Sequence, residues 1–307
     1  MISLEKTIAW IKNFLELEKP RGTGISIIIP FRAPKHDLQR TRNLDWVLRY
    51  WSAQLPGAEL IVSDDDDPSR PFSKSAAINR GFARSRGDIL VLVDADGYID
   101  ADAIIHCAKE IRKEEARDRR LWFVPYRKFY RLNEGASRLL LESDPANPYM
   151  FSYPPDPECI QGDADPNVGH WYGAMAQILS RKAFDIVGGW DERFRGWGGE
   201  DHAAMRATDT LYWHHKSLPD QVLHLWHPQI GPQGTAAWIH WKERMWEGQE
   251  DPAVNDRLSW RYYHAMGNKK RMRKLVDEGL KLSYRLIWTD IEYERHRHHK
   301  HHHRKSC

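Results

Sequence analysis

Three short apolar runs, separated by longer segments of helical periodicity, constrain the fold more than any other feature of this chain. The runs span residues 25–29, 59–63 and 89–93. Helical periodicity is expected over residues 38–55, 75–85 and about 102–115. Short apolar strands that alternate with helices are typical of a parallel sheet covered by helices on both faces. The sequence therefore predicts an α/β fold with a mostly parallel central sheet.

The ends of these strands point to a ligand site. The first run ends at Pro30, the second continues into Asp64, and the third continues into Asp94. The carboxyl ends of parallel strands meet at one edge of the sheet, and ligands of such sheets bind beyond that edge. We therefore expect these three positions to border one site.

Carboxylates follow two of the strands. Asp94 and Asp96, one residue apart, offer the hard oxygen ligands that Mg²⁺ and Mn²⁺ prefer, and such ions bridge to diphosphate oxygens. A solvated turn with an aspartate helix cap is the alternative. The run 64–67 is either a solvated acidic loop or a strand end at which Asp64 accepts an N–H of a pyrimidine base, with Phe72 and Lys74 close behind to stack on the base and attract phosphate.

The segment 196–201, Gly-Trp-Gly-Gly-Glu-Asp, carries the most specific pattern. Glycines around Trp197 allow the backbone to approach a ligand closely. Glu200 and Asp201 fall at the start of the following helix, where a carboxylate can act as a general base toward a hydroxyl group. A glycine-rich turn with an acidic helix N-terminus is the alternative interpretation.

Two histidines, His224 and His227, follow a short apolar run near residue 222. In an extended segment they face opposite sides, so only one of them is expected to share a metal ion with Asp96. A structural histidine with satisfied hydrogen bonds is the alternative.

Composition excludes several classes of protein. The 46 basic and 43 acidic side chains give a net charge of +3, so a nucleic-acid partner is not expected. No apolar run approaches the ~18 residues of a membrane span, which argues against an integral membrane protein. Residues 1–22 read as an amphipathic helix rather than a signal peptide, and three scattered cysteines favour a reducing compartment. Together these features predict a cytoplasmic protein.

In order and spacing, the motifs resemble those of GT-A fold glycosyltransferases over about residues 24–228. The resemblance rests on six pieces: 29–32, 72–74, 79–82, 94–96, 196–201 and His224. They are most similar to the β-1,4-galactosyltransferase type and to the related family 2 enzymes, including the chondroitin-polymerase and polypeptide N-acetylgalactosaminyltransferase branches. The resemblance implies a Rossmann-like three-layer sandwich of the nucleotide-diphospho-sugar transferase kind, with a C-terminal helical extension.

The resemblance also implies a domain organisation. After the N-terminal helix (1–22), a catalytic domain spans 23–231, with a nucleotide-binding half (23–120) and an acceptor and metal half (121–231). A helical extension (232–294) follows, and a His/Arg/Lys-rich tail (295–307) is expected to be solvated and disordered.

Site residues are implied in four groups. Those expected to bind the nucleotide sugar are Pro30, Phe31, Arg32, Asp64, Phe72, Lys74, Asp94 and Ala95. Those expected to bind Mn²⁺, or Mg²⁺, are Asp96 and His224. Those expected to contact the acceptor are Trp197, Gly198 and Gly199. The catalytic pair is Asp201, as general base, and Glu200.

The function implied is a metal-dependent glycosyltransferase that moves a hexose or N-acetylhexosamine from a UDP-sugar to a hydroxyl acceptor, expected to be a glycan. The retaining branch of the wider group carries Asn after Gly-Gly-Glu, whereas this chain has Asp201, so inversion is expected. The alternatives are a retaining enzyme of the same fold and a non-catalytic module that binds nucleotide sugars or glycans. A nucleotidyltransferase is disfavoured because residues 30–34 contain no glycine.

Overall fold

The computed structural model describes residues 24–33, 38–161, 173, 175–196, 198–228 and 254–280. The expected N-terminal helix (1–22) and basic tail (295–307) lie outside the described residues. Of the expected helical extension (232–294), residues 254–280 are described, and nearly all of them are helical.

A six-stranded central sheet forms the middle layer. Its strands are β1 (Ile25–Pro30), β2 (Glu59–Ser63), β3 (Ile89–Val93), β5 (Phe123–Val124), β7 (Ala176–Ser180) and β8 (Lys216–Ser217). The strand order is β2-β1-β3-β7-β5-β8. All pairs are parallel except those of β7, which runs antiparallel to both β3 and β5. The predicted mostly parallel sheet is confirmed, with one reversed strand inserted into it.

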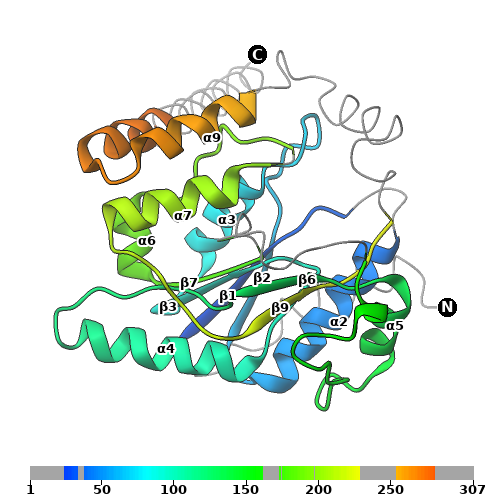
Figure 1. Cartoon of the computed structure of the whole chain (residues 1–307). Helices are drawn as coiled ribbons and strands as arrows, with labels where there is room; N and C mark the ends of the chain where they lie inside the picture. The colour runs from blue at the N-terminus through cyan, green and yellow to red at the C-terminus, as the bar shows by residue number, and fades with distance from the viewer. Residues whose placement is uncertain are drawn as a thin grey trace, which may run out of the picture.

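Helices cover both faces of this sheet (Figure 1). The helices on one face are α2 (Leu38–Gln54) and α4 (Ala101–Glu115). Those on the other face are α3 (Lys74–Arg84), α6 (Arg181–Val187) and α7 (Glu200–Leu211). Helix α9 (Val254–Ala265) packs on the outside of α7, and residues 269–280 form a further helix directly after it. The three-layer sandwich predicted from the sequence is therefore confirmed.

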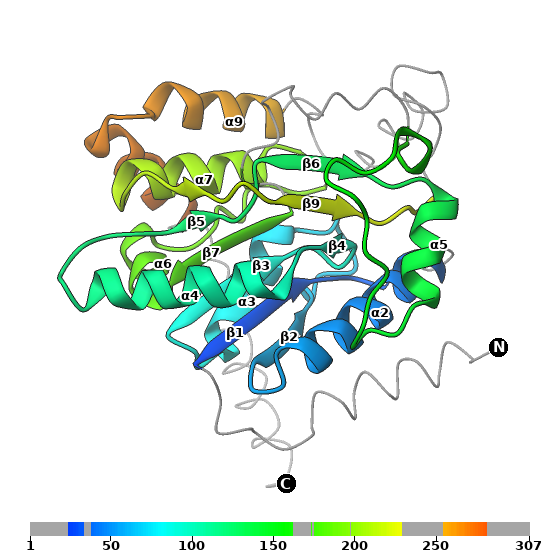
Figure 2. The same ribbon diagram turned by 60° about the horizontal axis from the view of Figure 1, so that its bottom comes forward.

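A second, three-stranded sheet lies beside the first (Figure 2). It consists of β4 (Gly97–Tyr98), β9 (Gln221–His224) and β6 (Lys128–Arg131), in the order β4-β9-β6. Gly97 is paired with His224, so the residue that precedes β4 lies next to the end of β9. This pairing links two motifs that are far apart in the chain.

The stretch 121–161 contains regular elements. Besides β5 and β6 it contains α5 (Glu134–Glu142) and a short 3₁₀ helix, η1 (Pro157–Cys159). Its two strands have two and four residues, too few to produce a recognisable alternation. Asn133 caps α5 by accepting a hydrogen bond from the Ala136 amide, a local signal that the prolines around it obscure.

Strands β1 and β3 are buried along their whole length, as their continuous apolar sequence requires. Trp46 and Trp51 of α2 and Trp122 beside β5 are completely buried, and each stabilises the fold by roughly 1.5–3 kcal/mol or more. Within the described residues, no helix is long and apolar enough to cross a membrane.

Candidate active site

The carboxyl ends of β1, β2 and β3 lie at one edge of the central sheet. Pro30 is paired with Ser63, and Ile28 with Leu92, so the three strands end level with one another. Pro30, Asp64 and Asp94 therefore lie at one edge of the sheet, as expected, and that they border one ligand site stays a prediction.

A lysine is at the centre of this edge, with 14% of its side chain exposed. Lys74, the first residue of α3, places its Nζ 2.6 Å from Asp94 Oδ1 and 2.8 Å from Asp201 Oδ1. Its ammonium also lies 5.8 Å from the ring centroid of Trp190, which is 6% exposed. Lys74 thus joins two motifs, the strand-end carboxylate and the first turn of α7, into one cluster that also borders Pro30.

The charges of this cluster are unequal, because three carboxylates surround one ammonium. Burial alone would lower the pKa of Lys74, but Asp201 and Asp94 outweigh it and raise that pKa well above its usual value. Burial raises the pKa of Asp94, and burial together with Asp201 raises the pKa of Glu200. Glu200 Oε2 is buried and has no hydrogen-bond partner within the described part of the chain. The cluster can therefore hold a proton and still offer a hydrogen-bond acceptor to a ligand.

Two glycines set the position of the acidic pair. Gly198 has a φ of 109° and Gly199, the N-cap of α7, a φ of 89°, a region that other residues rarely adopt. After this turn α7 begins at Glu200, as predicted, so Glu200 and Asp201 lie in its first turn. Trp197, expected to contact the acceptor, lies outside the described residues.

A possible metal site lies beside this cluster. Asp96 Oδ2 is 3.8 Å from His224 Nε2 and 3.6 Å from His227 Nε2, and one ligand atom from each residue lies within 4.8 Å of the others. Burial lowers the pKa of His224 to about 4, against the pull of Asp96, so the imidazole is neutral at pH 7. Burial alone would raise the pKa of Asp96, but His224, Arg40 and His227 lower it.

A neutral imidazole and an ionised carboxylate are the forms that bind a metal ion, so these residues fit a divalent cation. The Arg40 guanidinium of α2 also contacts this site, with Nη2 3.1 Å from His227 Nε2.

The expectation that only one histidine would face Asp96 is wrong. Strand β9 ends at His224, so strand alternation does not continue to His227. Three hydrogen bonds hold the intervening residues: the Leu225 amide donates to the Asp96 carbonyl, the Trp226 amide to Ser137 Oγ, and Asn43 Nδ2 to the Trp226 carbonyl. The chain bends there and returns His227 to the side of His224.

The residues expected around the base form a second group next to Lys74. Arg32 Nε donates to Asp64 Oδ1 at 3.0 Å, and the guanidinium lies 5.4 Å from the centre of the Phe72 ring. Arg32 also forms an ion pair with Asp65, which is 1% exposed and accepts a 2.8 Å hydrogen bond from the Ser73 amide. The structure therefore brings Arg32, Asp64 and Phe72 together, as predicted.

Asp65 was not among the predicted site residues, although a signal for it exists. Ile61 and Ser63 are the buried positions of β2, and continuing that alternation by one step places Asp65 inward. Two further predicted residues make no polar contact described above. Phe31 packs against the core, and Ala95 is 9% exposed between Asp94 and Asp96.

Comparison with known proteins agrees with this arrangement. The profile of the family described as glycosyl transferase family 2 matches residues 67–139, and that of the N-terminal domain of galactosyltransferase matches residues 172–209. The first segment contains Lys74, Asp94 and Asp96, and the second contains Glu200 and Asp201. None of the curated proteins matches the chain in sequence.

Among solved structures, the chain is similar to the catalytic domain of Drosophila β1,4-galactosyltransferase 7 in complex with xylobiose, with 16% identity, 63% of each chain covered and a TM-score of 0.35. For a mutant of that protein in complex with manganese, UDP-Gal and xylobiose, the identity is 15%, 63% of each chain is covered and the TM-score is 0.35. For GalNAc-T7 with UDP, GalNAc and Mn²⁺, the identity is 12%, the match covers 88% of this chain and 58% of that chain, and the TM-score is 0.41. The chain thus spans less than two thirds of the length of each.

The two profile matches lie in the order predicted from the motifs. They confirm that, along the segments that carry Lys74, Asp94, Asp96, Glu200 and Asp201, the chain is similar to glycosyltransferases of family 2 and of the galactosyltransferase type. Arg32, Asp64 and the two histidines lie outside the matched segments.

Proposed function

We propose that this protein is a metal-dependent glycosyltransferase that moves a hexose or N-acetylhexosamine from a UDP-sugar to a hydroxyl group of a glycan. The observation that carries the proposal is the contact of Lys74 with both Asp94 and Asp201, beside Asp96, His224 and His227. A carboxylate suited to activate a hydroxyl group is thereby placed next to a site suited to a diphosphate and its cation. Residues 23–231 are assigned to the catalytic domain and 232–294 to a helical extension.

The donor would bind along the ends of β1, β2 and β3. Arg32, Asp64 and Phe72 form a polar and aromatic edge for the uracil base. Asp94 and Ala95 would approach the ribose or the sugar, while the Lys74 ammonium would attract the diphosphate. Pro30 borders the same space.

Asp96, His224 and His227 would hold the metal ion. Two imidazoles and one carboxylate favour Mn²⁺ over Mg²⁺, which prefers oxygen ligands throughout. When bound, such an ion neutralises negative charge on a departing diphosphate.

Asp201 would accept the proton of the acceptor hydroxyl. The ion pair with Lys74 fixes the orientation of the carboxylate, and the adjacent Glu200 offers to the acceptor a buried oxygen that has no partner among the described residues. A base on the acceptor side favours direct attack on the anomeric carbon and hence inversion. Retention of configuration in the product would contradict this part of the proposal.

The test is UDP release from a panel of UDP-sugars, with Mn²⁺ and with a chelator. We expect slow metal-dependent hydrolysis of one donor, lost in Asp96→Ala. Asp201→Asn should still bind UDP, yet fall by about 10²-fold or more in transfer once an acceptor is supplied. Asp185→Asn, at an exposed position of α6, is the matched control and should behave as wild type. Binding of UDP-sugars without any turnover would support the alternative of a binding module.

A further inference from the structure

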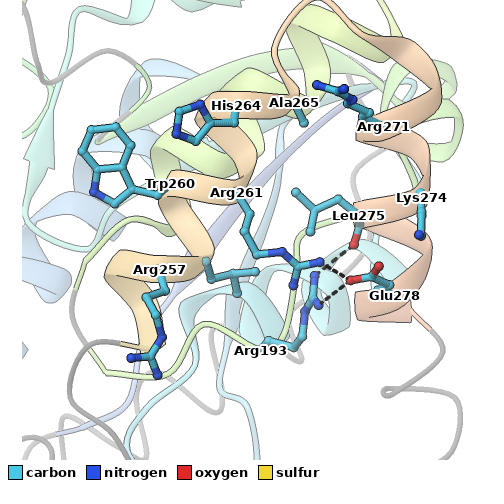
Figure 3. Close-up of a pocket in the computed structure, with 11 residues that line it drawn as sticks. Arg193, Arg257, Trp260, Arg261, His264, Ala265, Arg271, Lys274, Leu275 and Glu278 are labelled. Carbon is cyan, nitrogen blue, oxygen red and sulfur yellow. Dashed lines mark hydrogen bonds and ion pairs between the residues drawn. The ribbon is translucent and has the colours of Figure 1, made fainter.

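A large cavity lies outside the candidate active site, between α9 and the helix formed by residues 269–280 (Figure 3). Its volume is about 850 Å³. Five cationic side chains line it: Arg193, Arg257, Arg261, Arg271 and Lys274. Glu278 is the single carboxylate among the described residues that line it.

The excess positive charge of the cavity comes from Arg271 and Lys274, because Arg193 is paired with Asp191, at 2.6 Å, and Arg261 with Glu278. Glu278 Oε2 is shared by Arg261, at 2.5 Å, and Arg193, at 3.5 Å (Figure 3). Within the described part of the chain, Arg271 and Lys274 make no ion pair. A concave surface with a net charge of one sign concentrates the electric field, and its unpaired like charges repel one another until a counter-ion binds. The cavity is therefore suited to an anionic ligand.

An exposed aromatic surface lies beside these charges. Trp260 is 60% exposed, and its ring is stacked with that of His264, with centroids 5.7 Å apart and an interplanar angle of 27°. Both side chains line the cavity, on the same helix as Arg257 and Arg261 (Figure 3). A simple anion needs only the charges, whereas a flat aromatic face next to them suits a ligand that also carries rings.

The cavity lies on the helix that packs against the acceptor side of the candidate active site. Helix α9 packs on α7, whose first turn carries Asp201, and a Cβ at Gly199 would lie 3.0 Å from Ser259 Cβ, next to Trp260. Arg193, which lines the cavity, belongs to the segment that leads into Gly198 and Gly199. Helix α9 thus both lines the cavity and contacts the turn that precedes Asp201.

We propose that this cavity binds an acidic glycan, a sugar chain bearing carboxylate, sulfate or phosphate groups, as a remote part of the acceptor. That the bound chain is part of the acceptor rests on the proposed function, whereas the binding itself does not. A concave cavity can enclose a sugar chain, whereas the flat surface of a bilayer cannot enter it. The excess charge is also gathered in one cavity rather than in the long stripe that a nucleic acid requires.

The test is direct binding of a fluorescein-labelled oligogalacturonate hexasaccharide, followed by anisotropy in the presence of a chelator and without any donor. Maltohexaose, of the same length but uncharged, is the comparison. We expect saturable binding of the acidic chain only, weakened several-fold when NaCl rises from about 50 mM to about 300 mM.

Two pairs of variants locate the binding. The double variant Arg271→Gln with Lys274→Gln should weaken binding about tenfold. Lys270→Gln, an exposed position of the same helix outside the cavity lining, should change it less than about twofold. Trp260→Leu should also weaken binding severalfold, whereas Trp213→Leu, at another exposed tryptophan, should not.

Three results would overturn the proposal: no binding of the acidic chain, equal loss in Lys270→Gln, or tighter binding of phosphatidylglycerol vesicles or of a single-stranded DNA of about 20 nucleotides. Because no donor is present, absence of UDP release from the wild type would count against the proposed function and not against this cavity.

Discussion

Lys74 illustrates what a single residue can and cannot reveal in advance. Its position close behind the second strand predicted a cation that attracts phosphate. Its contact with Asp201, in a motif more than a hundred residues later, depends on how α3 and α7 lie on the same face of the sheet. Asp65 was not predicted as a site residue because this requires continuing the alternation of β2 beyond its apolar end. His227 was not predicted as a second metal ligand because this requires knowing where β9 ends.

At the same scale, Glu200 gives a pH-dependent prediction. Its pKa is raised by burial and by Asp201, so folding takes up a proton, and the stability that depends on this proton is lost as the pH rises through the folded-state pKa. Glu200→Gln has no such group. We expect the two proteins to be similarly stable near about pH 5, and the variant to be more stable by about 1–3 kcal/mol near about pH 8.

Urea denaturation of the metal-free proteins across this pH range measures the difference, in which titrating groups distant from Glu200 cancel. A gap that is constant with pH would show that the carboxylate of Glu200 is not desolvated.

Among the elements, those with strong periodicity were predicted almost to the residue. Strands β2 and β3 and helix α2 match their expected ranges within one residue. The reversed strand β7 and the sheet formed by β4, β6 and β9 were not predicted, because a strand's direction and a two-residue pairing are decided by tertiary contacts. The part of the site that depends on that second sheet, the pairing of Asp96 with both histidines, was accordingly predicted only in part.

The packing of α3 on β1 gives a prediction at this scale. Gly81 faces Ile28, and a Cβ added at Gly81 would overlap Ile28 Cγ2. We expect Gly81→Ala to destabilise the protein by about 1–3 kcal/mol, despite the better helix propensity of alanine. Gly135→Ala in α5 is the matched control, because its nearest atom, Asn133 Oδ1, lies 3.5 Å away.

The control should be neutral or more stable by up to about 1 kcal/mol. The midpoints of urea unfolding compare the two variants. Equal effects at both positions would mean that the α3–β1 contact is looser than the structure indicates.

For the whole molecule, the possible metal site links ligand binding to global stability. A cation that binds the folded state alone stabilises it by about 2.7 kcal/mol at a hundred times its Kd. We therefore expect Mn²⁺ to raise the Tm by several degrees relative to a chelator, and His227→Gln to lose most of this increment. His214→Gln, at an exposed histidine, should retain it. An Mn²⁺ increment that is the same in both variants would place the ion elsewhere.

The pairing of Gly97 with His224 also bears on how the protein is assembled. The ligand candidates come from parts of the chain separated by about 130 residues, so a long loop must close before they meet. In small zinc domains the ligands come from short loops, and the ion itself drives folding. Here the ion would arrive last, at a site that the polypeptide has already built. The fraction of chains able to take up metal would then report the fraction that has completed its topology.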